Sequence, residues 1–426
     1  MGSVRQQGPP CKEPQRYGRE QVLDMPDGVI LVINTGSSSL KFGLYAEQDG
    51  EERALLDGLA DGIGRTRGKI ELKDADGKIV RSEELQIASQ GEALEHGARW
   101  LSELPIGTPC AIGHRVVHGG PHLTAHKRVT PAVLEQLRSC VHFAPLHIPI
   151  ALDLIEKAEK IYGGLPQFAC FDTAFHTTMP ELAARFALPP GLYDEGIRRY
   201  GFHGLSYESI VRTAGASLPS RTVIAHLGSG ASLAAVKDGR SVDTTMGLTP
   251  TGGIPMATRS GDLDPGVILY LLRVKQMDAD GLERLLNHSS GLTALSGGTG
   301  DMRELEAAAE IGDGKAKLAI EVFCASVRKS IAAYAAVLGG LDLLIFSGGI
   351  GEHSARVRSR VCAGLEFLGV LLDDASNRGN GAVISKQDSA TRVEVVPSEE
   401  DRQIARHCRG LLCESMMGED GGRSPR

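Results

Sequence analysis

An arginine lies between apolar residues in the stretch Gly113-His114-Arg115-Val116-Val117-His118-Gly119-Gly120, just before a glycine turn. The guanidinium group of arginine can bind a carboxylate or a phosphate through two parallel hydrogen bonds, and burying it without such a partner is costly. Arg115 therefore indicates a site for an anionic substrate. An internal salt bridge is the alternative, because arginine often forms these.

An acidic residue ends a strand-like run further along the chain. Asp172 lies in Phe171-Asp172-Thr173-Ala174-Phe175-His176, directly after the apolar run that starts at Gln167. Proteins of the α/β class place catalytic groups at the carboxyl ends of their strands, so Asp172 is a candidate catalytic acid. A helix cap is the competing interpretation and, from the local sequence alone, the favoured one.

Two glycine-rich segments downstream combine arginine with histidine or with acids. In Arg198-Arg199-Tyr200-Gly201-Phe202-His203-Gly204 the histidine stands between glycines. This pattern suits the rim of a cleft where imidazole meets negative charge, although a structural histidine fits equally well. The segment from Thr249 to Pro265 holds three glycines, three prolines, one arginine and two aspartates. Such a composition predicts a long irregular loop, and long loops are usually functional.

Two Gly/Ser-rich turns each separate a pair of strand-like runs. One is Asn34-Thr35-Gly36-Ser37-Ser38-Ser39-Leu40-Lys41, and the other is His226-Leu227-Gly228-Ser229-Gly230. Successive backbone N–H groups at such a tip can bind an anion, here with Lys41 as a nearby charge, although most turns of this kind are only turns. Aligning residues 31–42 with 223–234 superposes Gly36 on Gly228 and Ser37 on Ser229. The alignment indicates an internal repeat, with chance similarity of two short hairpins as the alternative.

The elements that must position these residues follow an α/β pattern. Many short β-branched runs, separated by glycines, alternate with segments of helical periodicity. Apolar residues three and four apart predict a helix over about 315–338, followed by a buried strand over 341–346 and the glycine loop 347–351. Another helix is expected to open at 398–401, with Ile404, Cys408 and Leu411 on one face. At 426 residues the chain is expected to form two domains.

The bulk composition excludes several kinds of partner. A net charge of −7 argues against a nucleic-acid or anionic-membrane surface, and no apolar run reaches the roughly 18 residues of a membrane span. The eight cysteines include no C-x-x-C pair, which favours a reducing cytoplasm over a disulfide framework or a thiolate metal site. His114, His118, His122 and His126 stand four apart, but Gly119-Gly120-Pro121 would break the helix needed to align them, so we expect no zinc site there.

Eight motifs, in one order and at one spacing, resemble those of the acetate kinase family, which belongs to the acetate and sugar kinase, Hsp70 and actin superfamily. They are VINTGSSSLKF, GHRVVHGG, FDTAFHTTMP, RRYGFHG, HLGSG, TRSGDLDP, SGGIGEHS and VVPSEED. The resemblance covers about residues 28–412. It implies two duplicated ribonuclease H-like, or actin-like ATPase, domains with a cleft between them. The expected parts are a disordered leader (1–27), an N-terminal domain (28–175 with 396–414), a nucleotide-binding domain (176–395) and a disordered tail (415–426).

The resemblance implies reversible, ATP-dependent phosphorylation of acetate to acetyl phosphate, with Mg²⁺ or Mn²⁺, in a homodimer. It assigns catalysis to Asp172, His203, Arg259 and His147, and the metal ion to Asn34 and Glu400. Acetate is expected at Arg115 and at an apolar slot of Val117, Leu146, Phe202 and Pro250. ATP and ADP are expected to contact Lys41, Ser37 and Ser39, the segment His226, Leu227, Gly228, Ser229 and Gly230, the segment Asp301, Met302 and Arg303, and the segment Gly349, Ile350, Gly351, Glu352 and His353.

The chain departs from the family pattern at a few positions. Ser229 stands where the family has an asparagine in HLGNG, and His353 replaces the asparagine of GIGEN. The segment Ile148 to Ile150 replaces much of NPPN, and GLSY replaces GTSH after His203. These changes bear on nucleotide affinity rather than on the reaction class. Propionate kinase is the nearest alternative, since one methylene changes binding by only about 1 to 3 kcal/mol. A non-catalytic ATP-binding protein is the alternative from another class, against which Arg115 and the apolar slot argue.

Overall fold

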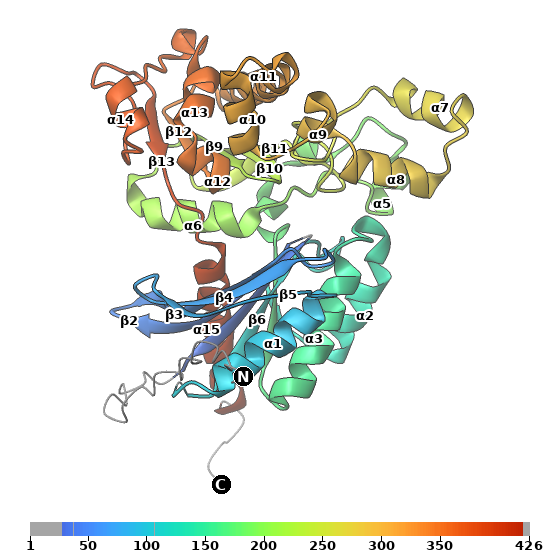
Figure 1. The fold of residues 1–426 in the computed structure, drawn as a ribbon, viewed down its shortest axis with the longest axis vertical. Coiled ribbons are helices and arrows are strands. Elements are labelled where there is room, and N and C mark those ends of the chain that lie inside the picture. The colour runs from blue at the N-terminus through green and yellow to red at the C-terminus, as the bar shows by residue number, and fades with distance from the viewer. Residues whose placement is uncertain (1–27, 37, 106, 421–426) are drawn as a thin grey trace, which may run out of the picture.

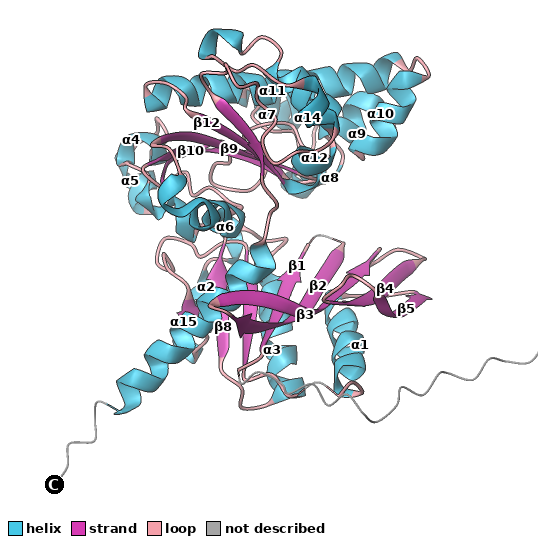
Figure 2. Ribbon diagram, turned by 90° about the vertical axis from the view of Figure 1, so that its left-hand side faces the viewer, coloured by secondary structure: helices cyan, strands magenta, loops and turns pink. Residues whose placement is uncertain are grey.

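A computed structural model describes residues 28–36, 38–105 and 107–420, and of residues 416–420 only the backbone. These residues form two β-sheets, one above the other, each with its own helices (Figure 1). Helix α6 (Gly204–Ala214) lies between the two sheets (Figure 2). The expected leader, Ser37, and the part of the expected tail beyond residue 420 lie outside the described residues.

The first sheet begins with an antiparallel meander and continues with parallel strands. Its order is β5-β4-β3-β2-β1-β6-β8-β7. Strand β1 pairs antiparallel with β2 but parallel with β6, which in turn pairs parallel with β8. The strands are β1 (Ile30–Thr35), β2 (Ser39–Gln48), β3 (Glu51–Asp61), β4 (Gly68–Asp74), β5 (Ile79–Leu85), β6 (Ala111–Val116), β7 (Lys127–Arg128) and β8 (Gln167–Phe171).

The second sheet repeats the central topology of the first. Its order is β11-β10-β9-β12-β13, with the first three strands antiparallel and β9, β12 and β13 parallel. The strands are β9 (Arg221–Leu227), β10 (Ala231–Lys237), β11 (Arg240–Thr244), β12 (Leu343–Ser347) and β13 (Arg392–Val395). The two Gly/Ser turns that align in sequence therefore occupy equivalent hairpins, β1–β2 and β9–β10, as the internal repeat predicts.

Helices cover both sheets and form many of the connections between their strands. The longer ones among the described residues are α1 (Gln90–Ser102), α2 (Pro131–Ser139), α3 (Ile148–Tyr162), α7 (Pro265–Arg273), α8 (Ala279–His288), α10 (Met302–Glu310), α11 (Gly314–Leu338), α13 (Ala355–Cys362) and α15 (Glu400–Asp420). The shorter ones are α4 (Glu181–Ala184), α5 (Pro190–Asp194), α9 (Gly291–Ser296), α12 (Gly348–His353) and α14 (Asp374–Arg378). Helix α11 and strand β12 confirm the helix and strand predicted over 315–346.

Helix α15 returns to the first sheet after the chain has built the second (Figure 1). Its residues Ile404 and Cys408 are fully buried against Ile30 and Val32 of β1 and Cys170 of β8, on the face that the predicted apolar stripe requires. The helix continues to Asp420, past residue 415, where the sequence predicts a loose tail. Among the described helices, none is both long enough and apolar enough to span a membrane.

Candidate active site

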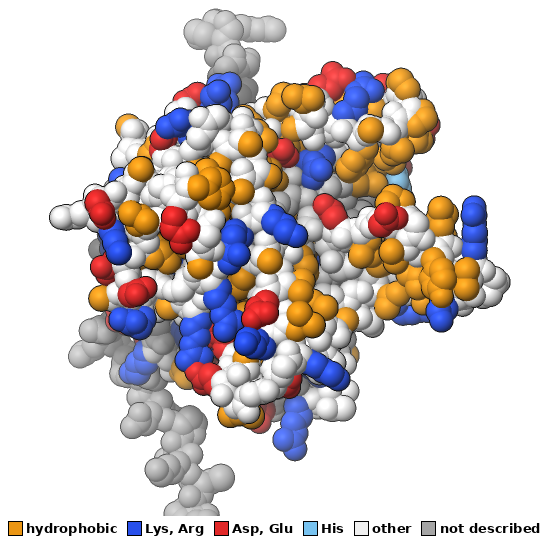
Figure 3. Space-filling model, turned by 90° about the horizontal axis from the view of Figure 1, so that it is seen from above, with side chains coloured by type: hydrophobic (Ala, Val, Ile, Leu, Met, Phe, Trp, Pro, Cys, Tyr) orange, Lys and Arg blue, Asp and Glu red, His pale blue; other side chains and the backbone are white. Residues whose placement is uncertain are grey.

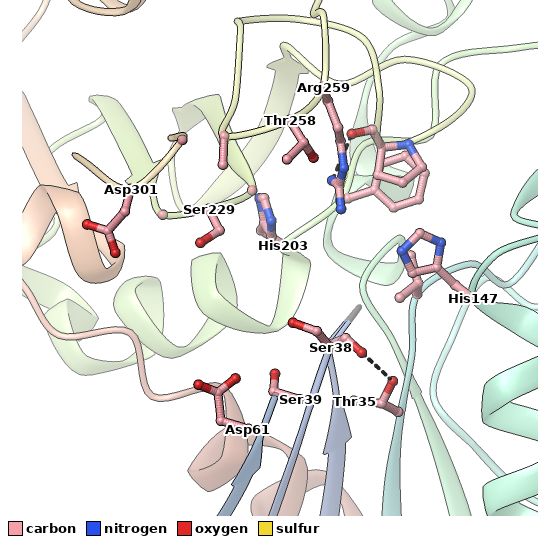
Figure 4. A pocket seen from close by; sticks show the side chains of 18 of the residues that line it. Thr35, Ser38, Ser39, Asp61, His147, His203, Ser229, Thr258, Arg259 and Asp301 are labelled. Carbon is pink, nitrogen blue, oxygen red and sulfur yellow. Dashed lines mark hydrogen bonds between the residues drawn. The ribbon is translucent and has the colours of Figure 1, made fainter. Parts of the chain in front are cut away.

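A cavity of about 900 Å³ lies between the two sheets and collects most of the candidate residues. Figure 4 shows Ser38, Ser39 and Asp61 on one side, facing Asp301, Ser229 and His203 on the other. The β1–β2 and β9–β10 hairpins thus approach the same space from opposite walls. We call this cavity the cleft.

Arg115 and Asp172, which both line the cleft, form an ion pair. Arg115 stands opposite Cys170 in the parallel pairing of β6 with β8, which brings its side chain to the carboxyl group two residues further on. Its Nε donates to both carboxylate oxygens of Asp172, at 3.2 and 3.0 Å, and its Nη2 donates to Oδ2 at 2.6 Å. Its Nη1 donates to Asn34 Oδ1 and to the Thr35 carbonyl, each at 3.2 Å. The internal salt bridge considered for Arg115 is therefore present, and Asp172 is an ion-pair partner rather than a helix cap.

Asp172 is fully buried, and its surroundings place it near the start of α6. Burial raises the pKa of Asp172 to about 6, although the Arg115 guanidinium opposes the rise. The carbonyl of Asp172 accepts the N–H of Gly204 at 2.9 Å. A Cβ on Gly204 would lie 2.2 Å from that carbonyl oxygen, so only glycine allows the contact. The start of α6 is therefore held against Asp172.

His203 precedes α6 in a left-handed conformation, with φ 58°, which is strained for a residue other than glycine. Its ring stacks on His226, 4.3 Å away between centroids. Burial lowers the pKa of His203 well below its usual range, and the neighbouring His226, Arg115 and Arg259 act in the same direction. The His203 imidazole is thus neutral at physiological pH. It can donate a hydrogen bond without carrying a charge.

Arg259 reaches the cleft from the long loop between β11 and α7 (Figure 4). Its Nη1 donates to the Pro250 carbonyl at 3.0 Å and contacts Met256 Sδ at 3.8 Å. Within the described residues no carboxylate lies within ion-pair distance of Arg259. Burial, and then the charge of Arg115, lowers the pKa of Arg259, as expected for a cation without a counter-ion.

Gly230 marks the point where His203 and Arg259 converge. A Cβ on Gly230 would lie 3.3 Å from His203 Nε2 and 3.5 Å from Arg259 Nη1. An oxygen atom close to this position could therefore accept from His203 and would lie beside the charge of the Arg259 guanidinium. The missing side chain leaves room for such an atom.

His147 and three of the four residues of the predicted apolar slot line the cleft. They are Val117, Phe202 and Pro250. Burial lowers the pKa of His147 to about 3, and the charges of Arg259 and Arg115 add to the effect, so His147 is neutral as well. Leu146 is 37% exposed and lines a neighbouring, largely apolar cavity of about 510 Å³ that shares His147 and Pro250 with the cleft.

Asn34 and Glu400, predicted to hold a metal ion, lie beside each other. Asn34 Nδ2 donates to Asp401 Oδ1 at 2.6 Å and to Glu400 Oε2 at 3.4 Å. Burial opposes ionisation of Glu400, but Arg115, His226 and Lys41 outweigh it and hold the pKa of Glu400 below its usual range. Glu400 therefore offers an ionised carboxylate to the cleft. The Asn34 amide oxygen is instead occupied by Arg115.

Lys41 does not line the cleft. It borders a second cavity, of about 480 Å³, together with Gly349 and Glu352. His226 and Glu400 line both cavities and separate them. Asp401, ahead of other causes, raises the pKa of Lys41.

The remaining residues predicted to contact the nucleotide are distributed unevenly. Ser39, His226, Gly228, Ser229, Gly230 and Asp301 line the cleft. Leu227 and Met302 are buried in the core of the second sheet, so only their backbone could serve a ligand. Arg303 forms an ion pair with Asp301, yet its side chain is 90% exposed. Ile350, Gly351 and His353 lie in α12, which borders the second cavity through Gly349 and Glu352.

Sequence reasoning missed several polar residues of the site. Asp61 and Arg65 border the cleft from the end of β3 and the turn after it. Their local sequence carries no motif, and only the pairing of β3 with β2 brings them there.

A second missed group is His126, Glu208 and His407, outside the cleft. Glu208 Oε2 lies 3.4 Å from His126 Nε2 and 2.7 Å from His407 Nε2. The three side chains could surround a metal ion, but His126 Nδ1 accepts the Phe171 N–H at 3.0 Å. That ring must keep its proton on Nε2, whereas a metal-binding histidine normally donates its other N–H. We therefore interpret the group as a hydrogen-bonded cluster that joins β8, α6 and α15.

Comparisons with known proteins agree on one family. The family model described as the Acetokinase family matches residues 29–406. An acetate kinase of Methylocella silvestris is 46% identical over 398 residues, which is 90% of this chain and 98% of that relative. The crystal structure of Porphyromonas gingivalis acetate kinase superposes with a TM-score of 0.80 at 37% identity, covering 90% of this chain and 100% of that one. A propionate kinase structure from Francisella tularensis gives a TM-score of 0.84 at 36% identity over the same shares. The chain belongs to the acetokinase family.

Proposed function

We propose that this protein transfers the terminal phosphoryl group of ATP to the carboxylate of acetate, reversibly, giving acetyl phosphate and ADP. The observation that carries the proposal is the convergence of Arg259 and His203 on the open space at Gly230. An unpaired cation and a neutral N–H donor aimed at one point suit the equatorial oxygens of a phosphoryl group in transfer. Membership of the acetokinase family, whose members include the acetate kinases above, supports the same reaction.

Arg115 is proposed to bind the acetate carboxylate, but with less of its guanidinium than the sequence predicts. Of its five N–H groups, one Nε–H and one Nη2–H serve Asp172, and the two on Nη1 serve Asn34 and Thr35. A single Nη2–H remains for the substrate. The acetate methyl group would then contact Val117, Phe202 and Pro250, which line the cleft near Arg115.

Asp172 is proposed to orient Arg115 rather than to abstract a proton. Acetate is already ionised at pH 7, so its attack on phosphorus needs no base. In the transfer, an acetate oxygen forms a bond to the phosphorus atom while the bond from phosphorus to the bridging oxygen of ADP breaks. The catalytic work is therefore positioning and charge stabilisation, for which a guanidinium held by two of its N–H groups on one carboxylate is suited.

The residues of the cleft fit a magnesium or manganese ion in one respect. Glu400 presents an ionised carboxylate, a hard oxygen donor of the kind that Mg²⁺ prefers. Asn34 would orient Glu400 through its Nδ2 group, because Arg115 occupies its oxygen atom. When bound with the nucleotide, the ion would neutralise charge on the phosphate oxygens.

The nucleotide is proposed to extend from Gly230 past Ser229 toward Asp301, along the wall shown in Figure 4. The phosphates would then lie between the two hairpins, near Ser39. Contacts from Lys41 and from residues 349–353 remain predictions. They require the ligand to reach the second cavity beyond His226 and Glu400.

Propionate is a second candidate substrate, because one structural feature favours it. The apolar cavity at Leu146 adjoins the proposed methyl site and shares Pro250 with it. A longer acyl chain could extend in that direction. Comparing kcat/KM for acetate, propionate and butyrate decides between them, and a preference for butyrate would contradict the acetate assignment.

We also infer a homodimer and a cytoplasmic location. Helix α7 has no buried residue, and it exposes Val267, Leu269 and Tyr270, with Val274 just beyond it. Figure 3 shows hydrophobic side chains gathered on the projecting side of the molecule, at the right of the view. Such a patch is typical of a protein–protein interface. The cysteines of the described residues are free, which suits a reducing compartment.

The direct test is a hydroxamate assay for acyl phosphate with ATP and acetate. The wild type should form acetyl hydroxamate, and Asp172→Asn and Arg259→Ala should lose most of this activity. Absence of product from the wild type, or full activity in both variants, would overturn the proposed function.

A further inference from the structure

The two nitrogen atoms of His203 have different surroundings. Nε2 faces the cleft, 3.3 Å from the position of a Cβ on Gly230. Nδ1 points into the protein and lies 2.8 Å from Ser232 Oγ on β10. Because the ring is neutral, it carries one proton, and the site works differently according to which nitrogen holds it. A proton on Nε2 makes His203 a donor toward the cleft, whereas a proton on Nδ1 makes it an acceptor, which would repel a phosphoryl oxygen.

Ser232 is itself hydrogen-bonded to a second hydroxyl group. Tyr207 Oη, from α6, lies 2.6 Å from Ser232 Oγ. Tyr207 and Ser232 are both fully buried. Tyr207 Oη has no other hydrogen-bond partner within the described residues. The three groups form a chain from Tyr207 through Ser232 to His203.

Counting protons along this chain selects one direction. If Tyr207 donates to Ser232, and Ser232 donates to His203 Nδ1, each hydroxyl proton is used. If His203 Nδ1–H donates to Ser232 instead, Ser232 either donates to Tyr207 or accepts from it as well. The first case leaves the Tyr207 proton buried without an acceptor, and the second leaves the Ser232 proton so. Such an orphan costs about 1 to 3 kcal/mol, enough to favour the first arrangement by roughly ten- to a hundredfold.

We propose that Tyr207 and Ser232 are positioning residues that fix the tautomer of His203, with its proton on Nε2 and directed into the cleft. The inference rests on the proposed function for its catalytic meaning, but the tautomer itself is a property of the protein without substrate. His203 then stabilises the phosphoryl group by hydrogen bonding rather than by charge. This leaves Arg259 as the cation at that point.

The protein contains a matched arrangement outside the cleft. His176 Nδ1 lies 2.8 Å from Ser241 Oγ on β11, and its Nε2 lies 3.0 Å from the Phe202 carbonyl. Because a carbonyl can only accept, His176 must carry its proton on Nε2. Ser241 is fully buried, like Ser232, but His176 does not line the cleft. His176 is therefore an internal reference for a histidine with its proton on Nε2. Ser241→Ala is the matched control for Ser232→Ala.

The test combines nitrogen NMR with kinetics. With ¹⁵N-labelled histidine, two-bond ¹H–¹⁵N spectra of the wild type at pH 7.5 should show the same tautomer for His203 as for His176, assigned by loss of signals in His203→Gln and His176→Gln. A proton on Nδ1 of His203, or a doubly protonated ring, would overturn the proposal. The tautomer of His203 can be measured even if the protein makes no acyl phosphate. The NMR result therefore distinguishes failure of the proposed tautomer from failure of the proposed function.

The kinetic arm compares Ser232→Ala, Tyr207→Phe and Ser241→Ala. Ser232→Ala should lower kcat roughly tenfold or more with little change in KM for ATP or acetate, because one orienting hydrogen bond is lost. Tyr207→Phe should lower kcat less, because Ser232 can still donate to His203. Ser241→Ala should keep kcat within about twofold of the wild type, since its histidine touches no reacting group. Equal losses of kcat in Ser232→Ala and Ser241→Ala would overturn the proposal. If Ser232→Ala does not fold, the proposal is overturned by an unchanged kcat in Tyr207→Phe together with a proton on Nδ1 of His203.

Discussion

Replacing Arg259 with alanine should separate activity from stability, because Arg259 is a charged group with few partners in the protein. Within the described part of the chain only its Nη1 is engaged, by the Pro250 carbonyl at 3.0 Å and by Met256 Sδ. The Nε–H and the two Nη2–H groups have no protein acceptor among the described residues. These three donors are free for a ligand.

The expected loss of activity follows from those free donors. If two of them bind the phosphoryl oxygens in the transition state, and each charged hydrogen bond is worth about 1.5 to 3 kcal/mol, the loss is about 3 to 6 kcal/mol. This corresponds to a fall of about 10² to 10⁴ in kcat/KM. The expected loss of stability is small. One hydrogen bond to Pro250 is worth about 1 kcal/mol, and removing a desolvated cation without a counter-ion offsets it.

The measurement pairs the hydroxamate assay with thermal unfolding. Arg259→Ala should lose activity while its Tm stays within about 2 °C of the wild type or rises. Arg199→Ala is the contrasting variant, since Arg199 lies outside the cleft and its Nη1 serves the carbonyls of Thr244, Thr245 and Met246. Arg199→Ala should show a larger fall in Tm than Arg259→Ala. The reasoning is refuted if Arg259→Ala keeps more than a tenth of the activity, or if its Tm falls as far as that of Arg199→Ala.

Three further predictions concern Asp172, Gly230 and Glu208. Because burial raises the pKa of Asp172 to about 6, the wild-type kcat/KM should fall below pH 6 as Arg115 loses its charged partner. Asp172→Asn should abolish this fall in the pH profile. A fall that persists in the variant contradicts its assignment to Asp172. Gly230→Ala should lower kcat because its Cβ would fill the space before His203 Nε2, whereas Gly107→Ala, whose Cβ meets nothing within 4 Å, should have no effect in the same assay. Hydrogen bonds from His126 and His407 overcome burial and lower the pKa of Glu208 from 4.5 to about 2, so its ionised form stabilises the fold above pH 4.5 and that contribution is lost as the pH falls toward 2. Glu208→Gln should therefore reduce the free energy of unfolding at pH 7 by up to about 3 kcal/mol, by urea titration, and an equal deficit at pH 3 and pH 7 would count against this explanation.

The sequence predicts the fold and the membership of the cleft better than it predicts how the side chains are used. Helical and strand periodicities locate α11, β12 and the buried face of α15, because these depend on residues near one another in the chain. The guanidinium of Arg115 is a different case. The pairing of β6 with β8 brings its main partner, Asp172, beside it. The local sequence of either strand does not predict that register. Most of the Arg115 N–H groups expected to bind a substrate therefore bind other groups of the protein.

The tautomer of His203 and the cluster at Glu208 could not be predicted for a similar reason. Ser232 and Tyr207 come from β10 and α6. Tyr207 ends the segment GLSY, but its departure from the family pattern gives no sign of a contact with Ser232. His126 lies just before β7, whereas Glu208 belongs to α6 and His407 to α15. In the sequence His126 stands at helical spacing with three other histidines, a pattern that the glycines and Pro121 break. Such groups arise from the packing of distant elements, which no local pattern encodes.

The return of α15 to the first sheet has a consequence for how the chain matures during synthesis. Strands β1, β6 and β8 emerge from the ribosome early, yet the face that carries Ile30 and Val32 remains open to water until Ile404 and Cys408 have been made. The fit is close, since a Cβ on Gly113 would lie 2.5 Å from Cys408 Sγ. The domain begun first is thus completed last, and a nascent chain carries an uncovered apolar sheet through most of translation, the condition in which chaperones are needed. The same helix delivers Glu400 to the cleft, so a truncated chain that lacks it would have neither a closed core nor a complete site.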